Sequence, residues 1–492
     1  MTKQFHGLSR YEQLVKECLD NRALNLPDAL PQVFGYLLSE NPITGNLSKK
    51  HIVDAFDALV ETMRTDEIGN GKADAGMTFL GQFVDHDITH DASSVIGTVI
   101  DPRSIRNVRT PHLDLDCVYG DGPDATPYMY SQKHEGYMLF GRKGSPLDLA
   151  RNHEGRAMIG DHRNDENIVV SQIQGAFICL HNILMTHAEE GTTVHHDIKD
   201  CSQMNIRAAA WDDYVPPKLM GFEQVRRFVR LHYQWIVLND LLPAFVDEKV
   251  IHQVLHHDPF HDRGPIMPAE FSGAAYRFGH ATVQPSYCLK KGGDQIDLFK
   301  MLGFSKRGPD SDIEMAQFFD VAGTRAQKAL PVGTKMAKTL FELPDNIVGS
   351  GLQWGDLLIP KKQAKKLALR NILRDRTALQ LPSGQQVARK LGLKQVKVPD
   401  VLKDHHISKT PLWFYCLQEA EQVGKGKLTG VGGSIVASVI IRLLKLDPAS
   451  ILNTPDFKPW DGFGSNFNMG SLMAYVEKHR GDIAHEKDLW TS

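Results

Sequence analysis

The segment GQFVDHDITHD at residues 81–91 concentrates side chains that can bind a metal or transfer protons. It holds three aspartates, two histidines and a glutamine, interleaved with three large apolar residues that proteins usually bury. If the segment is helical, Gln82, Asp85 and His86 share one face, while Asp87 is turned roughly 100° away from His86. One helix would then serve two separate sites.

Taken alone, this segment is compatible with several kinds of helix. His86 and His90 at i and i+4 resemble the paired histidines of metal-dependent hydrolases, and His-Asp doublets occur in phosphohydrolases. A polar helix without a catalytic role is the commoner origin of such a pattern. The rest of the chain has to separate these alternatives.

The composition describes a chain with balanced charge. Its 492 residues include Lys+Arg 56 and Asp+Glu 59, for a formal net charge of -3, which favours neither nucleic acid nor an anionic membrane as partner. The N-terminus lacks the apolar core of a secretory signal, and no run approaches the roughly 18 apolar residues of a membrane span. We expect cytoplasmic residence, with non-standard export and the oligomeric state left open.

The six cysteines show no CxxC spacing, which predicts reduced thiols and neither a disulfide framework nor a zinc site. Helical periodicity dominates, and convincing strands are few. The clearest helical patterns cover residues 168–188, 221–242 and 432–446. Turn-rich segments connect them at residues 118–127, 380–386, 424–433 and 459–470. We predict a mainly α fold: one large helical domain at residues 71–492 with long loops and little β, and an N-terminal extension at residues 1–70 packed on it.

Two later segments add residues of the same chemical kind. DHRNDEN supplies Arg163 and Glu166, and AAYRFGHATVQP supplies His280. The series GQxxDHD, RxxE and RxGHxxxQP, in this order and spacing, resembles the animal-type haem peroxidases of the peroxidase-cyclooxygenase superfamily. The resemblance runs from about residue 70 to the C-terminus, and residues 367–388 and 410–421 resemble bacterial members.

This resemblance implies a haem b peroxidase acting on hydrogen peroxide and small electron donors. His86 would be the distal histidine, since neutral imidazole can accept and return a proton near physiological pH. Arg163 would stabilise the oxyanion that develops as peroxide is cleaved. Gln82 resembles the glutamine of the family that orders water or halide.

On the other side of the haem, the resemblance makes His280 the axial iron ligand through a neutral imidazole nitrogen. Asn371 matches the asparagine that orients this histidine, and Arg277 is placed with the haem-binding residues. Asp85 and Glu166 match the carboxylates that form esters with haem methyl groups. Asn167 excludes the further sulfonium bond that a methionine makes at this position in some members.

The resemblance also implies a calcium site next to the distal helix. RTPHLDLDCVYG resembles the calcium loop of the family. Its ligands would be Asp87, Thr110, the carbonyl of His112, Asp114 and Asp116. Calcium prefers six to eight hard oxygen ligands, which this set offers. Asp116 stands where animal members have serine, so the site carries an additional negative charge.

Two alternatives remain beside the peroxidase. Fatty-acid dioxygenases of the superfamily need a tyrosine three residues before the axial histidine, and this position is Arg277; Tyr276 is one residue out and is expected to point elsewhere. A non-enzymatic binding module is disfavoured because His86, Arg163 and His280 are all present. The sequence leaves open the physiological donor, whether an aromatic molecule, a halide or thiocyanate.

Overall fold

The computed structural model describes residues 33–38, 47–66, 69–90, 107, 112–190, 221–261, 266–321, 323–454 and 456–491. Thr110, Cys18 and Cys201 lie outside these residues. The four described cysteines, Cys117, Cys179, Cys288 and Cys416, are free thiols.

Helices form most of the regular structure, which confirms the predicted mainly α fold. The α-helices are α2 (Lys49–Glu61), α3 (Ala75–Ile88), α4 (Asp116–Tyr119), α5 (Ile168–Glu189), α7 (Phe222–Ile236), α8 (Leu242–Phe245), α9 (Glu248–His256), α10 (Ala269–Gly273), α11 (Asp345–Val348), α12 (Lys361–Ala364), α13 (Leu367–Leu373), α14 (Gly384–Lys390), α15 (Asp400–Asp404), α16 (Leu412–Gln422), α17 (Gly430–Leu446), α18 (Met469–His479) and α19 (Glu486–Leu489).

Short 3-10 and π turns complete the helical structure. The 3-10 turns are η3 (Pro127–Met129), η4 (His162–Asp165), η7 (Ala275–Ala281), η8 (Leu298–Lys300), η9 (Pro309–Ser311), η10 (Met315–Gln317), η11 (Lys338–Phe341), η13 (Asp461–Phe463) and η14 (Arg480–Asp482). The π turns are η6 (Val237–Leu241) and η12 (Arg374–Ala378).

The described strands are short and form two-stranded sheets. They are β1 (Val33–Gly35), β2 (Arg64–Thr65), β3 (Phe140–Arg142), β4 (Ser145–Leu149), β5 (Ile266–Pro268), β6 (Ser286–Cys288), β7 (Gln295–Asp297), β8 (Met336–Ala337), β9 (Gly351–Trp354) and β10 (Leu357–Pro360). β1 pairs with β5 and β2 with β8, both parallel; β3–β4, β6–β7 and β9–β10 are antiparallel. Through β1 and β2, residues before position 71 join strands from the later chain.

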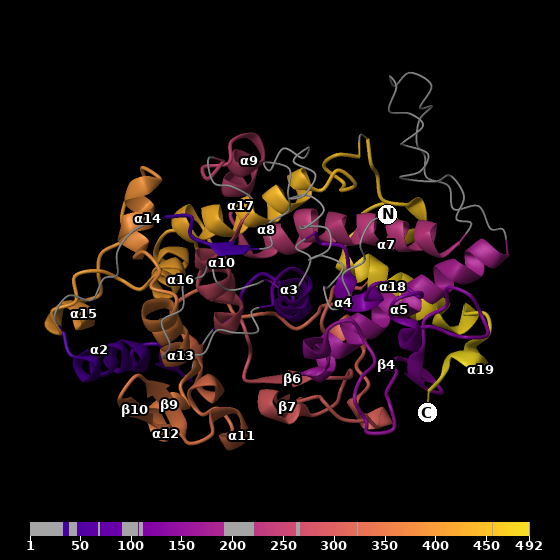
Figure 1. Ribbon diagram of the computed structural model, residues 1–492, viewed down its shortest axis with the longest axis horizontal. Coiled ribbons are helices and arrows are strands. Elements are labelled where there is room, and N and C mark those ends of the chain that lie inside the picture. Colours follow the sequence, from indigo (N-terminus) through magenta and orange to yellow (C-terminus); the bar gives the residue numbers. More distant parts are fainter. Residues whose placement is uncertain are drawn as a thin grey trace, which may run out of the picture.

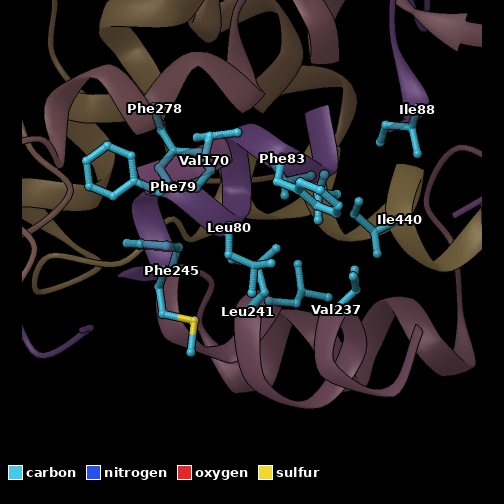
Figure 2. Packing of buried hydrophobic residues seen from close by; sticks show 14 of the residues in the cluster. Phe79, Leu80, Phe83, Ile88, Val170, Val237, Leu241, Phe245, Phe278 and Ile440 are labelled. Carbon is cyan, nitrogen blue, oxygen red and sulfur yellow. The ribbon is translucent and has the colours of Figure 1, made fainter. Parts of the chain in front are cut away.

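α3 lies near the middle of the molecule, with α5 and α7 to one side and α10 and α13 to the other (Figure 1). Its apolar residues pack against side chains from α5, η6 and η7, as Figure 2 shows for Phe83, Val170 and Leu241. The ring of Phe83 is fully buried and stacks on Phe177 of α5 with centroids 5.3 Å apart. Burying a large apolar side chain contributes roughly 1.5–3 kcal/mol, so the core fixes the rotation of α3 about its axis.

α5 is the long helix that supports α3 from one side. By length and composition it could cross a membrane, but all of its apolar window is buried inside the protein, as in the core helix of many proteins. A Cβ atom at Gly175 would lie 2.1 Å from the carbonyl oxygen of Leu147 in β4. Glycine at this position therefore lets α5 and β4 approach closely.

The three predicted helical segments are confirmed, with two refinements. Residues 222–245 run as α7, the π turn η6 and α8, so one wide turn interrupts the expected regular helix and directs Val237 and Leu241 towards α3 (Figure 2). Residues 380–386 are not all a connection, because α14 begins at Gly384, where Ser383 and Gln386 form a capping box.

Candidate active site

His86 lies in the last turn of α3 and is buried. Its Nδ1 is 2.8 Å from Oδ1 of Asn164, a residue of η4. Burial and the nearby Arg163 lower the pKa of His86 to about 4. The imidazole is therefore neutral at physiological pH, and Nε2 makes no hydrogen bond within the described part of the chain.

Gln82 and His86 occupy the same face of α3, as the spacing predicts, and this face meets Glu166. Nε2 of Gln82 donates to Oε1 of Glu166, and the same oxygen lies 3.9 Å from Nε2 of His86. Nδ2 of Asn167 donates to Oε1 of Gln82 over 3.1 Å, while its Oδ1 caps the start of α5. Both ends of the Gln82 amide are thus held by the segment that precedes α5.

Arg163 extends from η4 across the C-terminal end of α3. Its Nη2 donates to the carbonyls of His86 (3.0 Å) and Thr89 (2.7 Å), and Nε and Nη2 both donate to the buried carboxylate of Asp161. Within the described residues Nη1 makes no hydrogen bond. The guanidinium therefore stabilises the C-terminal end of α3, and Nη1 can donate a hydrogen bond to a ligand.

Two carboxylates adjoin this face. Asp85 accepts a hydrogen bond from Oγ1 of Thr89 over 2.8 Å. Burial raises the pKa of Glu166 to about 7, opposed by the positive charge of Arg163 and assisted by Asp85. At neutral pH the carboxyl group of Glu166 is therefore partly protonated.

His280 belongs to η7, which packs against α3. Its Nδ1 is 2.8 Å from the amide nitrogen of Asn371, a buried residue of α13. Burial and the positive charges of Arg277 and Arg374 lower the pKa of His280 to about 3, so the ring is neutral. Nε2 makes no hydrogen bond among the described residues.

Arg277 and Tyr276 have different hydrogen-bond partners. Nε of Arg277 donates to the carbonyl of Ser272, and the carbonyl of Arg277 accepts from the indole of Trp413. The hydroxyl of Tyr276, in contrast, donates to the carbonyl of Gly81 over 3.2 Å. The side chain of Tyr276 therefore contacts α3. From the sequence we expected it to point elsewhere.

Asp87 is turned away from His86 and faces a different group of residues. Its Oδ2 accepts from the hydroxyl of Tyr233 (3.1 Å) and the backbone N–H of Leu115 (3.3 Å). Carboxylate oxygens of Asp87, Asp114 and Asp116 lie within 4.8 Å of one another. Burial raises the pKa of Asp87, and the carboxylates of Asp116 and Asp114 raise it further.

The remaining predicted calcium ligands have different outcomes. Thr110 lies outside the described residues. The carbonyl oxygen of His112 is 3.4 Å from Nε2 of Gln234. Oδ1 of Asp87 is buried without a hydrogen-bond partner among the described residues, which is unfavourable for a carboxylate unless a cation or a proton compensates it.

The pairing of His86 with His90 as metal ligands is not supported. Among the described residues, the group of three or more potential ligands within 4.8 Å is Asp87, Asp114 and Asp116. Nδ1 of His86 is occupied by Asn164, and the ring of His90 lies near that of His162, with centroids 6.0 Å apart. Within the described residues, His86 and His90 therefore do not belong to a group of metal-binding side chains.

Three residues that hold His86 and Arg163 in place were missed from the sequence: Asp161, Asn164, and Gln174, whose Oε1 accepts a hydrogen bond from Nδ2 of Asn164 over 2.9 Å. Asp161 and Asn164 flank Arg163 within two residues, so their nearness to the site was available from the sequence. Gln174 stands seven residues after Asn167 in an apolar helix, and an amide in such a helix often signals a buried hydrogen bond.

Comparison with known proteins gives a consistent picture. Residues 91–411 match the family model described as animal haem peroxidase. The chorion peroxidase of Drosophila melanogaster is 32% identical over 142 residues, 27% of this chain. The aligned part spans about a sixth of that relative, 16% of its length.

Solved structures share the fold. Peroxidase A from Dictyostelium discoideum superposes with a TM-score of 0.58 at 14% identity, covering 95% of this chain and 96% of that one. The fatty acid alpha-dioxygenase of Arabidopsis thaliana gives 0.57 at 14% identity, covering 94% and 79%. The dioxygenase of Oryza sativa gives 0.54 at 16%, covering 92% and 82%. At such identities the likeness concerns the fold.

The position of Arg163 predicts that it stabilises the protein. Arg163→Met removes the guanidinium from the buried carboxylate of Asp161 and from the carbonyls at the end of α3. Breaking a buried pair leaves an uncompensated charge, so we expect the free energy of unfolding to fall by roughly 3 kcal/mol in urea denaturation. Lys403→Met, which breaks the exposed pair with Asp400, should change it by less than about 0.5 kcal/mol. Equal effects of the two substitutions would contradict this role.

Proposed function

Because the chain belongs to the animal haem peroxidase family, we propose that it is a haem peroxidase that reduces hydrogen peroxide and oxidises small electron donors. The observation that carries the proposal is a pair of neutral histidines, His86 and His280, on the packed elements α3 and η7. Each keeps Nε2 without a hydrogen bond in the described part of the chain. One can act as base and the other as iron ligand.

The residues around His280 fit a haem group. An iron ligand has to be a neutral imidazole, which the low pKa of His280 ensures. With Nδ1 next to Asn371, Nε2 is the nitrogen available for iron. A neutral ligand of this kind carries its proton on Nδ1. Rotation of the Asn371 amide by 180° exchanges its nitrogen and oxygen, so that the oxygen would accept a hydrogen bond from this N–H group. The positive charges of Arg277 and Arg374, which help to lower the pKa of His280, would attract the anionic propionates of haem.

Haem bound there would supply the redox-active iron that takes up oxidising equivalents from peroxide and passes them to a donor. The residues of the chain would handle the protons. Nε2 of His86 would accept a proton from hydrogen peroxide and return it to the departing hydroxyl oxygen. Nη1 of Arg163 would donate a hydrogen bond to this oxygen as it gains negative charge. Gln82, held at both ends, would order a water molecule beside Nε2.

We also propose that Asp85 and Glu166 attach the haem through ester bonds. Asp85 lies on α3 next to His86, and Glu166 lies between η4 and α5 with Oε1 3.9 Å from Nε2 of His86. Burial holds part of the Glu166 carboxyl in the protonated form. Esterification oxidises the haem methyl carbon, and hydrogen peroxide is the oxidant that the proposed reaction provides. Attachment would therefore increase with turnover.

The acidic cluster of Asp87, Asp114 and Asp116 is proposed to bind one calcium ion. Three carboxylates within 4.8 Å repel one another unless a cation is bound, and calcium prefers such oxygen ligands. Leu113 and Leu115, on either side of Asp114, adopt positive φ angles of 52° and 60°. Leucine seldom adopts this conformation, and bound calcium would offset its cost.

A fatty-acid dioxygenase is the second candidate, since the hydroxyl of Tyr276 lies at α3 beside an apolar cavity lined by Leu241, Phe245 and Phe278. The cavity has a volume of about 10 Å³, which is room for one water molecule. A fatty acyl chain needs a pocket of several hundred Å³. As described, this cavity would have to widen to admit an acyl chain.

The first test of the proposed function is the absorption spectrum of the full chain. We expect a Soret band, which His280→Ala should abolish or shift because the iron loses its ligand. Added imidazole, which can occupy the space left by the side chain, should restore part of the band. His261→Ala, at an exposed histidine, is the control and should leave the spectrum unchanged. A normal band and normal peroxidase turnover in His280→Ala would exclude this assignment.

Covalent attachment is tested after a few equivalents of hydrogen peroxide. Denaturation, haem staining and mass spectrometry should show pigment on the polypeptide. Asp85→Val and Glu166→Gln should each remove one attachment, and the double variant should release the haem. Glu154→Gln, at an exposed glutamate, should retain both. Complete extraction of free haem from the treated wild-type chain would rule out the ester bonds.

The calcium site is tested by metal analysis of protein purified without chelator. We expect about one calcium per chain and none in Asp87→Ala. Removal of the ion should lower the melting temperature, because a ligand that binds only the folded state stabilises it. Asp116→Ser keeps an oxygen ligand and should bind calcium more weakly, and Asp121→Ala, at an exposed aspartate, is the control. Calcium-free wild-type protein would contradict the site.

A further inference from the structure

A series of buried hydrogen bonds connects the ring of His86 to a backbone carbonyl. Nε2 of Gln174 donates to the carbonyl oxygen of Cys117 over 3.2 Å. Oε1 of Gln174 accepts from Nδ2 of Asn164 over 2.9 Å, and Oδ1 of Asn164 is 2.8 Å from Nδ1 of His86. Asn164 and Gln174 are fully buried. Each of these polar groups therefore depends on the next one for its hydrogen bond.

The direction of this series is fixed at one end. A backbone carbonyl can only accept a hydrogen bond, so Gln174 has to present its NH2 group to Cys117 and its oxygen to Asn164. Asn164 must then present its NH2 group to Gln174 and its oxygen to His86. Rotating either amide by 180° would place two acceptors or two donors against each other, at a cost of about 1–3 kcal/mol for each buried group left without a partner.

We propose that Asn164 and Gln174 are positioning residues that hold the proton of neutral His86 on Nδ1. The acceptor oxygen of Asn164 requires a donor on Nδ1, which leaves the lone pair on Nε2. Nε2 is the nitrogen that faces Gln82 and Glu166, on the side where peroxide would bind. The wrong tautomer would direct an N–H group to the peroxide and could not accept its proton.

The catalytic part of this inference depends on the proposed peroxidase function, but the tautomer itself does not. The hydrogen bonds belong to the chain alone. A measurement of the tautomer in the full-length protein therefore tests the positioning role even if haem were absent. Wild-type protein that carries the proton on Nδ1 but does not react with peroxide would contradict the proposed function and leave this inference standing.

The experiment uses ¹⁵N-histidine-labelled full-length protein at neutral pH, as purified, with any haem reduced and bound to carbon monoxide so that the iron is diamagnetic. Long-range ¹H–¹⁵N correlation spectra distinguish a protonated Nδ1 from a protonated Nε2, and His86→Gln identifies the signals. We expect wild-type His86 to carry its proton on Nδ1. A proton on Nε2 of the wild-type ring would overturn the proposal.

Variants separate positioning from packing. Asn164→Leu removes the acceptor and should give a mixture of tautomers, with peroxide reacting at least roughly 100-fold more slowly. Gln174→Met lets the Asn164 amide rotate and should have a smaller effect in the same direction. Asn164→Asp keeps an acceptor oxygen and should retain the proton on Nδ1.

The matched control is Asn182→Leu, which removes another buried amide of α5, one that binds the backbone of Met138. Even where Asn182→Leu lowers the stability as much as Asn164→Leu does, it should leave both the His86 tautomer and the peroxide rate unchanged. If Asn164→Leu folds and keeps the proton on Nδ1, Asn164 does not position the ring. If it does not fold, Gln174→Met and the wild-type spectrum decide.

Discussion

The carbonyl oxygen of Cys117 is the acceptor on which the hydrogen bonds around His86 depend. It accepts hydrogen bonds from Nε2 of Gln174 and from the backbone N–H of Asp161. From Gln174 the bonds lead through Asn164 to the ring of His86; from Asp161 they lead through Arg163 to the carbonyl of His86. Because buried polar groups are costly without partners, a shift of this carbonyl would disturb the side chains of both His86 and Arg163.

A second constraint, the packing of α3 in the core, explains why one helical turn faces two groups of residues. Asp85, His86 and Asp87 are consecutive, and the apolar packing of Phe83 fixes the rotation of α3 (Figure 2), so His86 faces Gln82 and Glu166 while Asp87 faces Tyr233. The acidic cluster includes Asp116, the residue before Cys117. Occupation of the cluster would therefore act on His86 through α3 and through the Cys117 carbonyl, two separate routes.

Much of this arrangement follows from local sequence. Helical spacing placed Gln82 and His86 on one face and Asp87 on another, and the mainly α fold follows from the periodicity of segments such as 168–188. The pairing of Arg163 with Asp161, two residues apart, was within reach of the sequence and was overlooked. The bond of Gln174 to Cys117 was not predictable, because it depends on how α5 packs against α4, 57 residues away in the chain. Tyr276 shows the same limit. Its spacing from His280 gave no information about its contact with Gly81, which lies 195 residues from Tyr276 in the chain.

The two sides of the site are held by different parts of the chain. His86 depends on α4, η4 and α5, whereas His280 depends on Asn371 of α13 and on Trp413 of α16, which binds the carbonyl of Arg277. Asp375 of η12, the turn that follows α13, links α13 to α16, since its carboxylate accepts a hydrogen bond from the backbone N–H of Trp413. What the two sides share is the apolar packing of α3 against its neighbours (Figure 2). The distance between the histidines is therefore set by the hydrophobic core, while the orientation of each ring is set by its own hydrogen bonds.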